Sequence, residues 1–108
     1  MRLRPAILAG TLACALLTGV RARAEGATVT IDNFAFTPAE ITVAPGTTVT
    51  WLNRDDIPHM VVDATQPRGF ISPPLDTDDS FKHAFDKPGT YHYFCSLHPH
   101  MQGTVVVR

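Results

Sequence analysis

Cys95, His98 and Met101 place a thiolate, an imidazole and a thioether in one stretch of seven residues, spaced three apart. No other stretch of the 108-residue chain concentrates soft donor atoms in this way. Thiolate and thioether ligands select copper over hard cations, and cysteine with histidine and a weak thioether is the donor set of a blue-copper site. Such a site needs a second histidine. His59, more than thirty residues before Cys95, is the candidate, so the two halves of the site would come from separate parts of the chain.

Zinc binding and covalent catalysis are the alternative uses of these residues. Structural zinc sites take four strong nitrogen or sulfur ligands, usually with paired cysteines, whereas this stretch has one cysteine and a methionine. Zinc could still occupy the site in a protein made without copper. A nucleophilic cysteine needs a base that a third group orients. His98 is near Cys95 in the sequence, but no acidic or amide residue with an orienting role is evident, so copper is favoured.

The first 24 residues have the features of an export signal. Two arginines precede a mostly apolar segment over residues 5–20, and Ala22-Arg23-Ala24 then supplies an A-x-A cleavage signal. The apolar segment is shorter than the roughly 20 residues that span a bilayer. We therefore expect residues 1–24 to be removed, a mature chain that begins at Glu25, and a periplasmic location. If the signal were retained, it would anchor the domain to the inner membrane.

Cysteine usage agrees with a metal site in an exported domain. Cys14 would leave with the signal, so the mature chain keeps Cys95 as its one thiol and can form no internal disulfide. Lipid attachment at Cys14 has little support, because Thr11-Leu12-Ala13 is a poor match to a lipoprotein signal. Cys95 could otherwise form an intermolecular disulfide or be a buried, unreactive thiol. Metal coordination accounts better for a lone cysteine followed by histidine and methionine.

The mature chain is acidic. Four of the nine basic residues lie in the signal, which leaves five against ten acidic residues, a net charge of 5 − 10 = −5 with neutral histidines. A domain of this charge is not expected to bind nucleic acid through its phosphates. It would favour a basic partner surface.

Short segments with alternating polar and apolar residues predict strands. They cover residues 28–31, 41–43, 47–53, 59–62, 80–85, 90–95 and 103–107. Residues 64–79 contain three prolines and predict a long surface excursion without regular structure. No window supports an amphipathic helix. The pattern is typical of an all-β protein, a Greek-key β-sandwich or small barrel, with one domain over residues 25–108.

Longer motifs extend across the whole mature chain. They read Phe36-x-Pro38-x-x-Ile41-x-Val43-x-x-Gly46-x-x-Val49-x-Trp51-x-Asn53, then Pro58-His59, then Gly89-Thr90-Tyr91-x-Tyr93-x-Cys95-x-x-His98-x-x-Met101-x-Gly103. With these motifs the chain resembles the cupredoxins of the plastocyanin, pseudoazurin and amicyanin group. The segment from Asn53 to His59 and the short Cys-x-x-His-Pro-x-Met loop resemble amicyanin most. The resemblance implies a Greek-key β-sandwich of about seven to eight strands, without substantial helix, that holds one type 1 copper ion.

The resemblance also implies the ligands and the function. His59, Cys95 and His98 would be the equatorial ligands, and Met101 the axial one. The protein would be a mobile carrier of single electrons in the periplasm and not an enzyme. It would be a monomer without stable membrane association once processed. Amicyanin-like features suggest an amine dehydrogenase as electron donor and a c-type cytochrome as acceptor.

A copper-binding module for storage or delivery is the alternative function. Such a protein usually exposes Met- and His-rich motifs, and Met-rich repeats are absent from the sequence. A copper oxidase or nitrite reductase needs further copper ligands and more than one such domain. The mature chain has 108 − 24 = 84 residues, which leaves no room for them.

Three positions near the ligands depart from the family pattern. Met60 stands where relatives often carry Asn, Ser or Thr that tethers the ligand loop, although its backbone N–H could still donate to the Cys95 sulfur. Leu97 replaces a usual proline, which would loosen the loop. His100 replaces an aromatic or apolar residue. It is either a solvated histidine or a titrating group at the mouth of the site.

The remaining polar side chains are expected outside the site. If His59 lies in a strand, Met60 points to the opposite face and is a core residue rather than the axial ligand. His92 lies between two tyrosines and should face outward, and His83 should be solvated. Asp55 and Asp56 are expected to be solvated loop carboxylates, with partner docking as the alternative.

Overall fold

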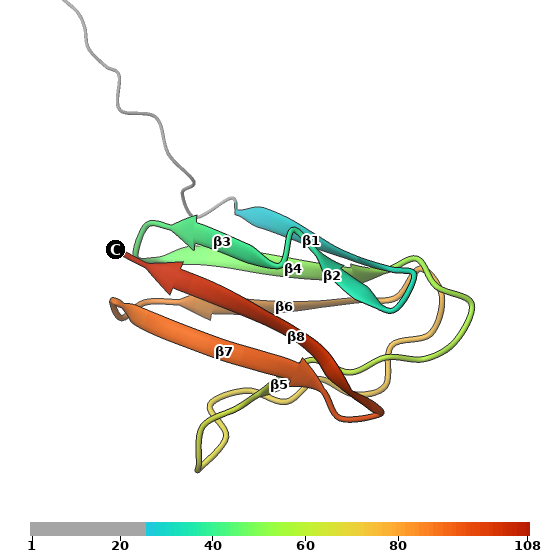
Figure 1. The fold of residues 1–108 in the computed structure, drawn as a ribbon. Coiled ribbons are helices and arrows are strands. Elements are labelled where there is room, and N and C mark those ends of the chain that lie inside the picture. The colour runs from blue at the N-terminus through green and yellow to red at the C-terminus, as the bar shows by residue number, and fades with distance from the viewer. Residues whose placement is uncertain (1–25) are drawn as a thin grey trace, which may run out of the picture.

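The computed structural model describes residues 26–108, which form two four-stranded β-sheets packed face to face (Figure 1). The strands are β1 (Ala27–Asp32), β2 (Ala35–Thr37), β3 (Glu40–Val43), β4 (Thr47–Asn53), β5 (Val62–Asp63), β6 (Ser80–Phe85), β7 (Gly89–Cys95) and β8 (His98–Val107). One sheet has the order β2-β1-β4-β6, and the other has the order β3-β8-β7-β5. The predicted all-β sandwich of seven to eight strands is confirmed. The predicted export signal and the start at Glu25 lie outside the described residues.

Within residues 26–108 no helix is long and apolar enough to cross a membrane.

The strands form because their side chains alternate between the core and the solvent. In β4 every second residue from Thr47 to Asn53 is buried, as the alternation predicts. The pairs β1–β4 and β3–β8 are parallel, and the other paired strands are antiparallel.

Two predicted strands had the wrong boundaries, and one strand was not predicted. The strand predicted over 59–62 is the two-residue β5, because His59 makes only an isolated bridge to Leu75. The last strand, predicted over 103–107, begins at His98, which pairs with Cys95 across an irregularity in the β7–β8 register. The short strand β2 was not predicted, since three residues are too few to show a period.

Trp51 lies at the centre of the core. Its side chain is fully buried, and its ring contacts Tyr93 edge to face with ring centroids 5.2 Å apart. The ring centroids of Phe70 and Phe85 lie 6.0 and 6.2 Å from the ring centroid of Trp51. Burial raises the pKa of Tyr93 to about 12, and the nearby indole N–H of Trp51 offsets a small part of this shift. Neither the indole nitrogen of Trp51 nor the hydroxyl of Tyr93 has a well-directed hydrogen-bond partner within residues 26–108.

Residues 64–79 have no strand, as predicted, but they are more than a surface excursion. Phe70 and Leu75 belong to the hydrophobic core, and Ser72 is also buried. Asp63 fixes the start of the segment, because its carboxylate accepts hydrogen bonds from the Thr65 hydroxyl at 2.7 Å and the Gly69 amide at 2.7 Å. The segment therefore covers an edge of the sandwich with its own packed side chains.

Candidate metal centre

Three connections meet at one end of the sandwich. They are the β1–β2 turn, the segment that follows β4, and the β7–β8 turn, all on the right-hand side of Figure 1. The two sheets contribute to this end from opposite layers. His59 lies on the second of these connections, and the other candidate ligands lie on the strands that flank the third.

Asn53 fixes the segment that carries His59. Its buried side-chain amide donates to the carbonyl oxygens of Ile57 at 3.0 Å and Leu75 at 2.8 Å. Its side-chain oxygen accepts the amide of Asp55 at 2.9 Å. His59 and Leu75 then exchange two backbone hydrogen bonds, at 3.1 and 2.8 Å. The His59 ring is fully buried as a result.

Cys95 and the two histidines converge. The Cys95 Sγ lies 3.8 Å from His59 Nδ1 and 3.8 Å from His98 Nδ1. The three donor atoms all lie within 4.8 Å of one another. Cys95 is buried and free, and His98 is half-buried at the start of β8. The structure thus brings together residues that stand 36 positions apart in the chain.

These separations suit a metal ion. An ion that bonds sulfur at about 2.3 Å and nitrogen at about 2.0 Å in a trigonal plane holds those donor atoms roughly 3.7 Å apart. One thiolate, two imidazoles and a nearby thioether form the donor set of a blue-copper site. Met101 is the candidate for the thioether, as the sequence predicts. It is 3% exposed and belongs to the same buried cluster as Cys95.

The backbone amide of Met60 donates to the Cys95 Sγ at 3.3 Å. A thiolate that accepts this bond is held toward the histidines, since the donor is fixed in the backbone. The side chain of Met60 is half-buried rather than in the core, which corrects the prediction. Its Sδ accepts a hydrogen bond from the Ser96 hydroxyl at 3.2 Å, so the segments that carry His59 and Cys95 stay linked.

Asp55 was predicted to be a solvated carboxylate, and this was wrong. Its side chain is only 11% exposed, and its Oδ2 lies 2.7 Å from the Nε2 of His59. Burial by itself raises the pKa of Asp55, but the hydrogen bonds from the Phe34 and Asn33 amides and from His59 outweigh it. The pKa of Asp55 therefore lies below its usual value. The only sequence signal was a carboxylate four residues before His59 in a short loop.

Phe34 is the second residue that the sequence did not reveal. Asn33 and Phe34 form the β1–β2 turn with φ of 54° and 59°. A left-handed φ is unfavourable for a bulky residue and is found mainly where the surroundings enforce it. The Phe34 ring contacts His59 and His98 edge to face, with ring centroids 5.4 and 5.0 Å apart. The turn thus covers both imidazoles with an aromatic ring.

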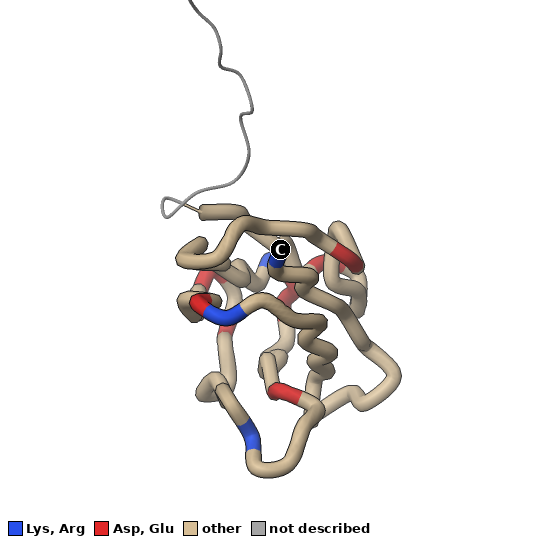
Figure 2. The backbone as a smooth tube through the Cα atoms, turned by 90° about the vertical axis from the view of Figure 1, so that its left-hand side faces the viewer, with Lys and Arg blue, Asp and Glu red and all other residues tan. Residues whose placement is uncertain are grey.

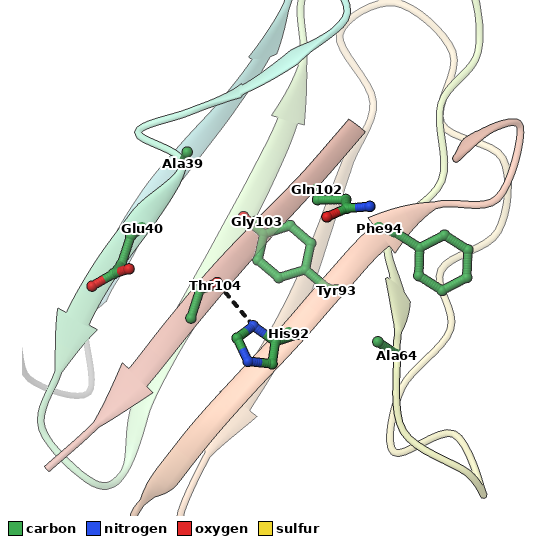
Figure 3. Close-up of a pocket in the computed structure, with 9 residues that line it drawn as sticks. All are labelled: Ala39, Glu40, Ala64, His92, Tyr93, Phe94, Gln102, Gly103 and Thr104. Atoms are coloured by element: carbon green, nitrogen blue, oxygen red, sulfur yellow. Dashed lines mark hydrogen bonds between the residues drawn. The ribbon is translucent and has the colours of Figure 1, made fainter. Parts of the chain in front are cut away.

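The other histidines lie outside the centre. His92 is exposed, as predicted, and its Nδ1 lies 3.1 Å from the Thr104 hydroxyl (Figure 3). His100 is also exposed. His83 was expected to be solvated, but it is half-buried, with its ring 4.6 Å from that of Phe70. Burial lowers the pKa of His83, and Asp63 and Asp86 offset part of this effect.

A hollow of about 440 Å³ lies on the outer face of the β3-β8-β7-β5 sheet, and Figure 3 shows its lining. Glu40, His92 and Gln102 supply polar groups to it. None of the four candidate ligands lines this hollow. The basic residues of the described part are Arg54, Arg68, Lys82, Lys87 and Arg108, and Figure 2 shows those in view as separate blue positions along the backbone.

The sequence and the structure both match known copper proteins. Residues 24–108 match the family described as "Copper binding proteins, plastocyanin/azurin family". Amicyanin-alpha of Methylorubrum extorquens is 35% identical, over 90% of this chain and 85% of that protein. A plastocyanin of Scenedesmus fuscus is 36% identical, over 68% of this chain and 86% of that protein.

Solved structures give the same result. The Cu(I) form of a methionine-to-alanine variant of amicyanin superposes with a TM-score of 0.73 at 33% identity, over 78% of this chain and 83% of that one. A purple cupredoxin from Nitrosopumilus maritimus superposes with a TM-score of 0.71 at 36% identity, over 76% of this chain and 99% of that one. Fold, donor set and sequence agree, and the chain belongs to the plastocyanin/azurin family of copper-binding proteins.

Proposed function

We propose that this protein is an exported, mobile carrier of single electrons that holds one type 1 copper ion through His59, Cys95, His98 and Met101. Copper is the cofactor of its family, and electron transfer rather than catalysis is the activity of amicyanins and plastocyanins. The convergence of one cysteine and two histidines within 4.8 Å is the observation that carries the proposal.

The surroundings of the donors suit electron transfer. Cu(I) favours soft ligands and Cu(II) favours nitrogen ligands, so a site that offers both and is held rigid rearranges little when its charge changes. Cys95 and His59 are fully buried, and Asn53 and Leu75 fix the backbone around His59. When bound, the copper supplies the redox change. The chain itself holds the donors, excludes water from Cys95 and covers the imidazoles with Phe34.

His98 provides the exit for the electron, because it is the half-buried ligand at the surface. Two large apolar side chains near His98 are exposed. Leu97 precedes His98 in the chain and is 47% exposed, and Phe34 contacts the His98 ring and is 51% exposed. An apolar surface around a ligand allows a partner to approach closely and to separate quickly. We propose redox proteins as partners, with an amine dehydrogenase as donor and a c-type cytochrome as acceptor.

A visible spectrum of the copper-loaded, oxidised protein tests the site. We expect an intense blue thiolate-to-copper band that disappears on reduction and in Cys95→Ser. His92→Ala is the matched control, since this exposed histidine lies outside the site, and it should keep the band. A colourless copper complex that cannot be reduced would overturn the proposal and favour copper storage or delivery.

Export and partners need separate measurements. Periplasmic protein should begin at Glu25 by mass spectrometry and elute as a monomer of the mature mass. The oxidised protein should bleach when mixed with a reduced amine dehydrogenase and regain colour with an oxidised c-type cytochrome. A protein that stays in the cytoplasm with residues 1–24 attached would contradict the export proposal but not the copper site.

A further inference from the structure

The carboxylate of Asp55 makes three hydrogen bonds at the metal end of the sandwich. Oδ1 accepts the amide of Asn33 at 2.6 Å, and Oδ2 accepts the amide of Phe34 at 2.9 Å. Oδ2 also lies 2.7 Å from the Nε2 of His59. One side chain therefore connects the β1–β2 turn to the candidate ligand.

This carboxylate is fixed in place. The two turn amides point to it because Asn33 and Phe34 both adopt a left-handed φ. The backbone of Asp55 is anchored as well, since its carbonyl accepts the Thr77 hydroxyl at 2.6 Å and its amide donates to Asn53. Neither the side chain nor its backbone is free to turn away from His59.

The contact assigns the tautomer of His59. An ionised carboxylate accepts hydrogen bonds and donates none, so the proton lies on Nε2. Nδ1 then carries the lone pair, and this is the nitrogen that lies 3.8 Å from the Cys95 Sγ. The nitrogen that would bind the metal is the one that Asp55 leaves deprotonated.

The two candidate histidine ligands differ in this respect. Within residues 26–108, the Nε2 of His98 has no hydrogen-bond partner, and its ring is half-buried. His59 has a carboxylate partner and is fully buried. Of the two imidazoles, Asp55 therefore makes a hydrogen bond only to that of His59.

We propose that Asp55 is a positioning residue for His59 and that its charge lowers the reduction potential of the bound copper. The proposal rests on the proposed function, because it takes His59 as a copper ligand. A carboxylate that accepts the second N–H of a ligand histidine fixes its orientation and makes it a stronger donor. A stronger nitrogen donor stabilises Cu(II) more than Cu(I), since Cu(I) favours softer ligands.

Asp55→Asn tests the charge while the size of the side chain is kept. We expect Cu(II) affinity to fall about 10- to 100-fold, as when such outer partners are removed elsewhere. A tenfold loss confined to Cu(II) raises the potential by about 59 mV. Asp56→Asn is the matched control. It removes one charge from the exposed neighbour, which makes no hydrogen bond to His59, and should leave the potential near the native value.

Asp55→Glu keeps a carboxylate within reach and should restore the potential toward the native value. A purely structural role of Asp55 would lower stability without moving the potential. The proposal is wrong if Asp55→Asn and Asp56→Asn shift the potential equally, or if neither does. A blue wild-type protein would leave the proposed function standing in that case, whereas a wild-type protein without the blue band would refute the proposed function itself.

A second measurement does not depend on any variant. In the copper-free wild-type protein, nitrogen-15 NMR of the imidazoles should show His59 with its proton on Nε2. That proton should be shifted downfield by the carboxylate and exchange slowly. A His59 that carries its proton on Nδ1 would overturn the proposal even if Asp55→Asn failed to fold.

Discussion

The Ser96 hydroxyl donates a hydrogen bond to the Met60 Sδ at 3.2 Å, and this contact joins the residue after Cys95 to the residue after His59. The resemblance seen in the sequence led us to expect a polar side chain that tethers the ligand loop at position 60, where this chain has a methionine. Here a thioether accepts the bond, with the Met60 amide donating to Cys95 in parallel. The two halves of the metal site therefore remain tied across the sandwich.

The first prediction concerns this link. A double-mutant cycle of Ser96→Ala and Met60→Leu should give a coupling energy of about 0.5 to 1 kcal/mol, as for a single neutral hydrogen bond. Leucine keeps the volume of methionine but accepts no hydrogen bond. Urea unfolding of the copper-free proteins measures the coupling. Strictly additive effects would show that the contact contributes nothing.

The second prediction concerns Gly103, which pairs with Tyr93 across β7 and β8. A Cβ at position 103 would lie 2.3 Å from both Cζ and the hydroxyl of Tyr93, whose ring is packed in the core. Gly103→Ala should therefore lower the free energy of unfolding by about 1 to 3 kcal/mol through overpacking.

Gln102→Ala is the control for Gly103→Ala. Gln102 is the exposed neighbour on the same strand and should change stability by less than about 0.5 kcal/mol. Near-ultraviolet circular dichroism of Gly103→Ala should also change, since the Tyr93 and Trp51 rings must shift. Native stability of this variant would show that the strand pair can open at no cost.

The third prediction is a pH dependence that arises from His83. Burial against Phe70 and Phe85 lowers the pKa of His83 below its usual value of 6.5, so the folded protein favours the neutral ring. The unfolded chain binds the proton more readily. This contribution to stability is therefore present above about pH 6.5 and is lost as the pH falls below it.

Urea midpoints at pH 7.5 and 5.5, compared between the wild type and His83→Leu, measure this dependence. The difference between the two proteins cancels the titration of the other histidines. We expect the wild type to lose more stability than His83→Leu on acidification. Equal losses would exclude His83 as the source.

The fourth prediction concerns Asp63, which is 3% exposed. Burial raises the pKa of Asp63, but the hydrogen bonds from Thr65 and Gly69 outweigh this effect, so the pKa lies below the usual 3.8. Its stabilisation is therefore present at neutral pH and is lost as the pH falls through the folded-state pKa. Asp63→Ala should cost about 2 to 3 kcal/mol at pH 7, because the carboxylate accepts several hydrogen bonds.

The same variant should open the segment that follows β5. Without Asp63 the Gly69 amide and the Thr65 hydroxyl lose their acceptor, so residues 64–70 should become sensitive to limited proteolysis. Asp86→Ala is the control, since this exposed residue accepts no hydrogen bond from that segment. Equal cleavage rates in the two variants would contradict the assigned role.

Much of the fold follows from local sequence. The strands predicted over 47–53 and 80–85 agree with β4 and β6 at every residue, because their side chains alternate without interruption. The alternation fails around His59 and between His98 and Met101. There the chain is held by an isolated bridge and by an irregular strand pair, which leave no period in the sequence.

The sequence by itself determined the donor types and their spacing in Cys95, His98 and Met101, and donor type selects the metal. Only the tertiary structure decided what surrounds them. The contact of Asp55 with His59 and the position of Phe34 over His98 depend on a turn and a loop that follow different strands. Such contacts are set by how the sheets bring distant segments together, so no local pattern of residues could reveal them.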